Sequence, residues 1–316
     1  MLAKHSRRRA SRWFWVNYLT ARVQFGRTLV LLALGLLLSS CAAVHSTGNS
    51  KTTLWQVRGD RNIVYLLGSI HILPKQAYPL NPVIERAFDN ANAIAFEIDL
   101  NRVTKDTFKQ AFARTAFYPP GNSLSRNLGF ETVLLLERVL PVYGLTLKQV
   151  ERYKPWFLAE TLNSRALHLA GFSEQLGVDV YFYHKALAAH KPVLGLETVH
   201  DQAQIFSRMD NAQNERYLLS TIYGLPAFPE IMGKLVNAWE TGDVAVLDQM
   251  VNQNKEADRE NHEALFSRRN TRWLPEIERL AHENGNFLVV VGAGHLVGDD
   301  GVVAQLRRAG YAVRQL

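Results

Sequence analysis

The pattern of apolar and polar residues predicts strands and a helix between residues 53 and 100. Residues 54–58 alternate between apolar and polar positions, as in a strand with one exposed face. Residues 63–67 and 93–96 are continuous apolar runs, as in strands buried on both faces. Asn81-Pro82 predicts the start of a helix that runs to residue 90, because proline suits the first helical turn. This order of strand, helix and strand indicates a right-handed βαβ unit.

The rest of the chain is mostly helical by the same criterion. Apolar residues recur every three or four positions in five segments that we expect to be helices: residues 131–142, 155–170, 179–189, 212–222 and 229–239. A buried strand at 192–196 interrupts them, and a long charged helix over 255–284, broken near Pro275, follows. The chain closes with a strand, a helix and a strand at residues 287–291, 299–309 and 311–314.

These elements predict an α/β fold in a domain that spans residues 53–316. The strands from both ends of this domain should share one mixed, largely parallel sheet, because both ends must bury their apolar faces in one core. A large helical insertion, about residues 103–285, should lie between them in the chain.

The first 40 residues have the features of a bacterial export signal. Their charged residues are all basic: Lys4, Arg7, Arg8, Arg9, Arg12, Arg22 and Arg27. The apolar run at 29–38 is too short to remain as a membrane span, which needs about 20 residues. It ends in Leu38-Ser39-Ser40-Cys41, which resembles the lipobox of bacterial lipoproteins. An ordinary cleaved signal with a chance cysteine is the alternative.

The lipobox resemblance implies that residues 1–40 are removed and that Cys41 carries lipid. Residues 41–52 are mostly small and polar, and we expect them to form a flexible tether. Two acyl chains would anchor the protein to a membrane that it does not span. Ala42 follows Cys41 where aspartate would signal retention at the inner membrane. We therefore expect an outer-membrane lipoprotein that faces the periplasm, if the host is Gram-negative.

Removal of the leader changes the charge of the protein. The chain has 36 basic and 29 acidic residues, a net charge of +7. Seven of the basic residues and none of the acidic residues lie in the leader, so the mature part has 29 of each. This balance argues against nucleic acid as a partner. Cys41 is the only cysteine, so the sequence offers neither a disulfide framework nor a catalytic thiol.

Three of the predicted strands are followed by residues that suit one metal site. Gly68-Ser69-Ile70-His71 and Gly292-Ala293-Gly294-His295 each follow a buried strand, and a third strand ends at Glu97. In open α/β sheets, ligands bind outside the carboxyl ends of the strands, where these side chains would meet. Two imidazoles and a carboxylate form a common open metal site. The alternative is that both histidines are ordinary hydrogen-bonded loop residues.

Several sequence blocks together resemble the TraB/GumN family from about residue 53 to the C-terminus. They are Leu54-Trp55-Gln56-Val57, Tyr65-Leu66-Leu67-Gly68-Ser69-Ile70-His71, Phe96-Glu97-Ile98-Asp99, Gly195-Leu196-Glu197-Thr198-Val199-His200-Asp201-Gln202, Arg269-Asn270 and the run from Val290 to Val302. That family includes the animal Tiki membrane proteins, which are divalent-metal-dependent proteases with two Gly-x-x-His motifs. It also resembles erythromycin-esterase-like hydrolases, and it contains a pheromone-inhibition protein.

The family resemblance implies roles for six residues. His71, Glu97 and His295 are the expected metal ligands or catalytic residues, with Mn, Co or Zn as the divalent ion and Glu97 as ligand or general base. Glu197, Arg269 and Asn270 match further family positions. Glu197 would orient a ligand or, alternatively, cap the helix that begins near Val199. Arg269 would bind a substrate carboxylate or stabilise an oxyanion, unless it is a solvated residue of a charged helix.

Two classes of function remain open at this point. The first is a metal-dependent hydrolase, most plausibly a peptidase, that acts on a peptide or another component of the cell envelope. The second is a non-catalytic envelope protein that binds or regulates through the same cleft. A serine hydrolase with a Gly-x-Ser-x-Gly elbow is excluded, because the sequence lacks that motif. A His-Glu-x-x-His zinc site is also excluded, because residue 286 after His282-Glu283 is Asn.

Overall fold

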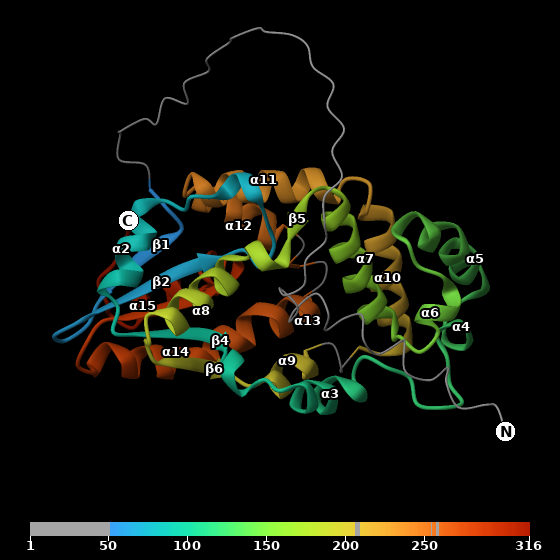
Figure 1. Cartoon of the computed structure of the whole chain (residues 1–316), viewed down its shortest axis with the longest axis horizontal. Coiled ribbons are helices and arrows are strands. Elements are labelled where there is room, and N and C mark those ends of the chain that lie inside the picture. Colours follow the sequence, from blue (N-terminus) through green and yellow to red (C-terminus); the bar gives the residue numbers. More distant parts are fainter. Residues whose placement is uncertain (1–50, 206–208, 254, 257–258) are drawn as a thin grey trace, which may run out of the picture. The chain divides into compact units, whose positions relative to one another are not determined.

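A computed structural model describes residues 51–205, 209–253, 255–256 and 259–316 (Figure 1). The predicted signal peptide and Cys41, the predicted lipid attachment site, lie outside the described residues. None of the helices in the described part has both the length and the apolar character that a membrane span requires.

A six-stranded mixed sheet forms the centre of the domain, as the sequence predicts (Figure 1). Its strands, in spatial order, are β6 (Val193–Glu197), β4 (Ala93–Ile98), β7 (Phe287–Gly292), β2 (Ile63–Ser69), β1 (Leu54–Arg58) and β8 (Val313–Gln315). The first four are parallel to one another, and β1 is antiparallel to both β2 and β8. A second, two-stranded sheet pairs β3 (Leu73–Pro74) with β5 (Phe172–Ser173).

Strand β7, from the end of the chain, lies between β2 and β4, from its beginning. Val290 is paired with Leu67 on one side and with Phe96 on the other. The two strands of the predicted βαβ unit are therefore separated by a third strand. Because β2, β4 and β7 are parallel, their carboxyl ends lie at the same edge of the sheet.

Helices cover the sheet and form a second, helical core. They are α2 (Pro82–Asn90), α3 (Lys105–Ala113), α4 (Leu124–Asn127), α5 (Phe130–Val139), α6 (Leu147–Val150), α7 (Pro155–Leu169), α8 (Val178–Ala188), α9 (Val199–Gln204), α10 (Asn211–Gly224), α11 (Phe228–Glu240), α12 (Val244–Asn252), α13 (Arg259–His262), α14 (Arg268–His282) and α15 (Val302–Arg308). Residues from α2, α8, α11, α12, α14 and α15 join the core around the sheet. Residues from α4 to α7 and α10 build a separate apolar core, away from the sheet in Figure 1.

The long C-terminal helix is broken at a different place from the one predicted. Pro275 lies inside α14, and the irregularity is a π-helical segment, Glu263–Ser267, that joins α13 to α14. Pro275 is exposed, so water can satisfy the helical carbonyl that lacks its N–H partner. On the opposite face, the buried residues Trp273, Ile277 and Leu280 hold the helix against the sheet. Packing therefore outweighs the loss of one hydrogen bond.

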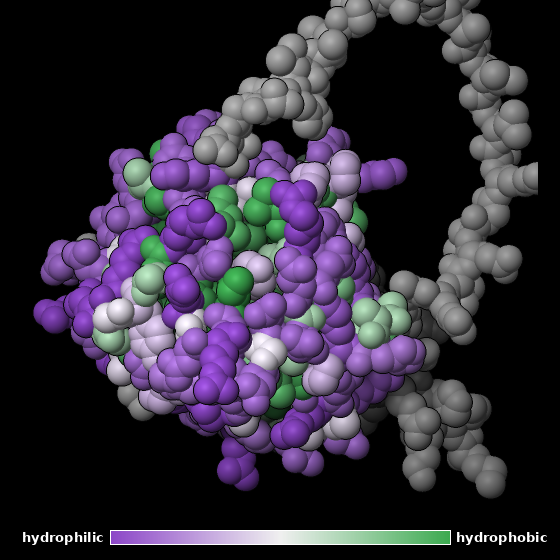
Figure 2. Space-filling view, turned by 90° about the vertical axis from the view of Figure 1, so that its left-hand side faces the viewer, coloured by the Kyte–Doolittle hydropathy of each residue, from purple (hydrophilic) through white to green (hydrophobic). Residues whose placement is uncertain are grey.

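The space-filling view in Figure 2 shows the end of the domain that lies on the left of Figure 1. Hydrophilic residues dominate this face, and the apolar residues form small separate groups among them (Figure 2). Isolated apolar side chains are normal on a protein surface and indicate no interface by themselves.

Candidate functional site

The carboxyl edge of the parallel strands gathers the two predicted histidines around Glu97. His71 follows β2, Glu97 is the second-last residue of β4, and His295 ends a 3₁₀ turn after β7. The Nε2 atom of His71 lies 3.9 Å from Oε1 of Glu97, and Nε2 of His295 lies 3.8 Å from the same oxygen. Both imidazoles therefore face one carboxylate oxygen.

Gly292 leaves the space in which these three side chains meet. A Cβ atom at this position would lie 3.3 Å from Oε1 of Glu97 and 3.5 Å from Nε2 of His71. The Gly292 N–H also donates a hydrogen bond of 2.8 Å to Oε1 of Glu97. The φ angle of Gly292 is −50°, which any residue can adopt. Space, and not backbone conformation, therefore favours glycine here, because a Cβ atom would press on the Glu97 carboxylate.

Arg269 is the centre of the cluster, and the alternative of a solvated helix residue is wrong. Its side chain is buried, and its guanidinium donates to two carboxylates at once, those of Glu97 and Glu197. The Nη2–Oε1 distance to Glu197 is 2.7 Å. Nη1 donates to the Leu265 carbonyl at 3.0 Å and to Nε2 of His295 at 2.9 Å. All three nitrogens of the Arg269 guanidinium thus donate hydrogen bonds to other groups of the protein.

Glu197 binds Arg269 and does not cap a helix. Its carboxylate accepts from Nε and Nη2 of Arg269 and from the indole N–H of Trp273 at 3.2 Å. Thr198 is the N-cap of α9, and it forms a capping box with Asp201. The capping alternative for Glu197 is therefore wrong, because the neighbouring threonine has taken that place.

Hydrogen bonds at the far ring nitrogens orient both histidines. Nδ1 of His71 lies 2.9 Å from the Asp179 carboxylate. Nδ1 of His295 lies 2.6 Å from Oδ1 of Asn270, whose Nδ2 donates to the Asp300 carbonyl. Because that amide oxygen only accepts, Nδ1 of His295 carries the proton and Nε2 presents its lone pair to Arg269. Asn270 thus has a defined function as the residue that orients His295.

The surroundings fix the charge of Glu97 and His295. Burial alone would raise the pKa of Glu97, but the neighbouring charges, the Arg269 guanidinium among them, and the Gly292 N–H lower it to about 2. Burial lowers the pKa of His295 to about 3, and the nearby cation acts in the same direction. At neutral pH, the cluster therefore holds an ionised Glu97 beside a neutral His295.

His71 differs from His295 in charge and exposure. The side chain of His71 is 60% exposed, whereas that of His295 is 4% exposed. The Asp179 carboxylate raises the pKa of His71 above its ordinary value. Of the two histidines, His71 is therefore the one that can meet a molecule arriving from outside.

A cavity of about 480 Å³ opens onto the cluster. Its reactive side is formed by His71, Glu97, Arg269 and His295. Its other walls come from α7, α11, α12 and the π-helical segment and are largely apolar; they include Leu167, Phe228, Met232, Leu235, Leu247, Val251, Leu265 and Phe266. The volume lies within the range of sites that bind small molecules or single side chains.

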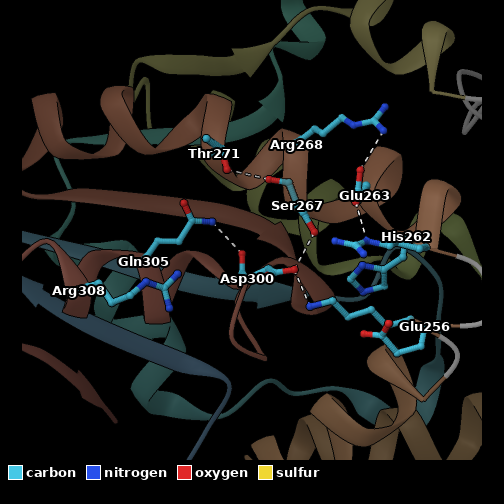
Figure 3. A pocket seen from close by; sticks show the side chains of 11 residues that line it. Glu256, His262, Glu263, Ser267, Arg268, Thr271, Asp300, Gln305 and Arg308 are labelled. Carbon is cyan, nitrogen blue, oxygen red and sulfur yellow. Dashed lines mark hydrogen bonds and ion pairs between the residues drawn. The ribbon is translucent and has the colours of Figure 1, made fainter.

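A second pocket contains none of the predicted site residues (Figure 3). It has a volume of about 680 Å³, and its charged side chains largely pair with one another. Lys255 pairs with Asp300 at 2.6 Å, and Arg268 pairs with Glu263 at 3.0 Å (Figure 3). These pairs leave little charge for a ligand, so the cavity at the strand ends is the better candidate.

The three predicted ligands fit a divalent metal ion by their chemistry. Each histidine directs Nε2 to one carboxylate oxygen, while its other nitrogen is held by Asp179 or Asn270, as in many metal sites. Among the described residues, no three such side chains lie close enough to hold an ion without movement. Neighbouring ligands of an ion would be roughly 3.0–3.5 Å apart, so the donors must close in and His295 must release Arg269.

Sequence reasoning missed three contributors to the site. Asp179 appeared only as the start of a helix, and its contact with His71 depends on how the segment before α8 packs against the residues after β2. Gln202 donates to Oε2 of Glu97 at 3.1 Å. Trp273 packs against His295 with ring centroids 4.5 Å apart, and lies under the Arg269 guanidinium. Two of them carried a usable signal: Gln202 ends one of the family blocks, and Trp273 is an apolar residue of an amphipathic helix.

Fold and site together define an α/β protein with a histidine–glutamate–arginine cluster at the carboxyl ends of parallel strands. The chain belongs to the TraB/PrgY/gumN family, whose sequence profile matches residues 53–315.

Similar proteins occur in bacteria. The chain is 23% identical over 276 residues to an uncharacterized protein of Treponema pallidum (strain Nichols), covering 80% of each chain. It is 24% identical over 262 residues to the uncharacterized protein YbaP of Escherichia coli (strain K12), covering 79% of this chain and 89% of YbaP. No solved structure matches the chain.

Proposed function

We propose that the protein is a divalent-metal-dependent hydrolase of the bacterial cell envelope that cleaves peptides. The observation that carries this proposal is the meeting of His71, Glu97 and His295 at the floor of a cavity. The two Gly-x-x-His segments, which resemble those of the Tiki proteases, support the same reaction class. Ionised carboxylate and neutral imidazole are the forms that bind a metal ion; Glu97 and His295 already have them at neutral pH, and His71 would release a proton when the ion binds.

His71, Glu97 and His295 are the residues that would hold the ion. Once bound there, a divalent ion supplies Lewis acidity to a substrate carbonyl and to a water molecule. Arg269 holds Oε2 of Glu97 in place, so Oε1 remains directed at the two histidines. In the alternative role of general base, the ionised Glu97 would accept a proton from water at Oε1 and leave the ion to the two histidines.

The location belongs to the same proposal. Cys41 would carry the lipid that anchors the protein to the outer membrane, with the domain in the periplasm. A peptide or another envelope component would then reach the cavity in that compartment. This rests on the lipobox alone, because the residues before Lys51 lie outside the described part of the chain.

The decisive experiment compares metal content and cleavage in a small set of variants. The full chain, purified in detergent, would be analysed for bound Mn, Co and Zn and for cleavage of a mixed peptide library. We expect His71→Ala and His295→Ala to lose both metal and cleavage, because about three protein ligands hold a catalytic ion. Glu97→Gln with metal but without cleavage identifies a general base, and loss of both identifies a ligand.

His282→Ala is the matched control, since His282 lies in another pocket and contacts Asp60 and Tyr311. It should keep metal and activity. Full metal and full cleavage in both other histidine variants would refute the proposal. A wild-type protein that never holds a stoichiometric ion would favour the non-catalytic binder.

A further inference from the structure

Glu160 is an acidic side chain in the cavity that the proposed reaction does not use. It belongs to α7 and lines the cavity. Its Oε1 accepts a hydrogen bond from the Tyr217 hydroxyl. Among the described residues, no lysine, arginine or histidine pairs with it. A buried carboxylate is usually paired with a cation, and Glu160 has one neutral hydrogen-bond donor instead.

The other acidic groups of the cavity already have partners. Glu97 is bound by Arg269, Gln202 and the Gly292 N–H. Glu174 accepts from Ser164 at 2.7 Å and also contacts His168. Arg269 is fully engaged by Glu97, Glu197 and the Leu265 carbonyl, so it has no donor left for Glu160. The negative charge of Glu160 is therefore the one that the protein leaves uncompensated.

Apolar side chains also line the cavity that contains Glu97 and Glu160. Leu167, Met232 and Phe266 are among them, from three different elements. The cavity thus combines an apolar wall with a carboxylate of its own, separate from the reactive cluster. An aliphatic stem that ends in a cation matches both features.

Ser69 is a second polar residue of the cavity with a hydrogen-bonding group that is not satisfied. This residue is 3% exposed and lines the cavity beside His71, and its hydroxyl has no hydrogen-bond partner among the described residues. Buried hydroxyls are almost always paired. The hydroxyl oxygen is itself enclosed, so the Ser69 side chain would have to turn towards the cavity to bond an amide or carbonyl of a bound molecule.

We propose that the cavity binds the lysine or arginine side chain of a peptide, with its cationic head at Glu160, its stem on the apolar wall and the adjoining amide near Ser69 and His71. The cleavage of that peptide rests on the proposed function, but the binding does not. Burial raises the pKa of Glu160, so an arriving cation also stabilises the ionised form of this carboxyl.

A binding experiment tests the cavity independently of catalysis. The probes are hexylamine and hexanol, which share a six-carbon stem and differ in charge, and binding to the full chain in detergent is measured by calorimetry. Wild-type protein should bind hexylamine, and Glu160→Gln should bind it at least about tenfold more weakly, because a buried charged contact is lost. Hexanol should bind equally to both proteins.

Glu174→Gln is the matched control, since Glu174 lines the same cavity but is already paired. It should bind hexylamine like the wild type. Tyr217→Phe keeps the carboxylate and should also retain binding, which separates charge from the local hydrogen bond. Equal binding of hexylamine by wild type and Glu160→Gln, or no binding by the wild type, would overturn the assignment.

A cleavage experiment distinguishes this inference from the proposed function. Two peptides would be compared that differ only by lysine or norleucine at one position, so that the stem is kept and the charge removed. Preference for lysine that disappears in Glu160→Gln supports both proposals. Cleavage of both peptides at equal rates contradicts the cation site alone. Charge-dependent binding without cleavage of any peptide contradicts the hydrolase alone.

Discussion

Nη1 of Arg269 lies 2.9 Å from Nε2 of His295, so a fixed cation donates a hydrogen bond to a buried neutral imidazole. This is the same lone pair that a metal ion would need. A divalent ion and Arg269 therefore compete for one atom of His295. Arg269 keeps its contacts with Glu97 and Glu197 when this bond is broken, so the exchange costs only one of its hydrogen bonds.

Replacement of Gly292 by alanine should abolish cleavage with little loss of stability. The added Cβ would lie 3.3 Å from Oε1 of Glu97 and would enter the space between the two histidines. The backbone conformation allows alanine, so the cost is limited to crowding, about 1–3 kcal/mol. Peptide cleavage and urea denaturation measure the two effects. Gly224→Ala, at a glycine with open space, is the control and should leave both unchanged.

Replacement of Arg269 by methionine should destabilise the domain strongly. It would leave Glu97 and Glu197 buried without their common cation, and such a loss typically costs about 3–5 kcal/mol. The double variant Arg269→Met, Glu197→Gln should recover part of this cost, because one of the unpaired charges is then gone. Urea denaturation of wild type, both single variants and the double variant measures the coupling. Strictly additive effects would contradict the pairing.

Glu160 should make the domain less stable at neutral pH than at acid pH. Burial raises the pKa of its carboxyl in the folded state, so the folded protein binds this proton more tightly than the unfolded chain. The stabilisation is present below the unfolded pKa and is lost as the pH rises through the folded pKa. Glu160→Gln mimics the protonated form and should raise the melting temperature at pH 7 but not at pH 4. An equal shift at both values would show that ionisation is not involved.

Replacement of Cys41 by serine should prevent lipidation. The motif Leu38-Ser39-Ser40-Cys41 motivates this prediction, and labelled palmitate incorporated by growing cells measures it. Wild-type protein should carry the label and fractionate with membranes, whereas the variant should do neither. Equal labelling of both proteins would show that the lipobox is not used.

The strands and the meeting of His71, Glu97 and His295 could be predicted for the same reason. Each residue follows or ends an apolar run, and parallel strands place such ends at one edge. The sheet order could not be predicted, because all the buried runs have similar patterns. Strand pairing depends on long-range packing that a single run does not encode.

The burial of Arg269 can be predicted from its spacing relative to apolar residues of the same helix. Arg269, Trp273 and Ile277 are spaced four residues apart, so they share one face of α14. Because that face is apolar, an arginine in the same row points into the core. By contrast, the contact between Asp179 and His71 joins the first turn of α8 to the segment after β2, and no periodicity of the sequence indicates it.

The central place of β7 determines when the cluster can assemble during synthesis of the chain. The strand that joins β2 to β4 and carries His295 begins only at Phe287, near the end of the chain. A nascent chain that stops before this point has two unconnected sheet fragments and a cluster without His295. The cluster therefore cannot be completed before nearly the whole domain has been made, and premature termination anywhere upstream leaves it incomplete.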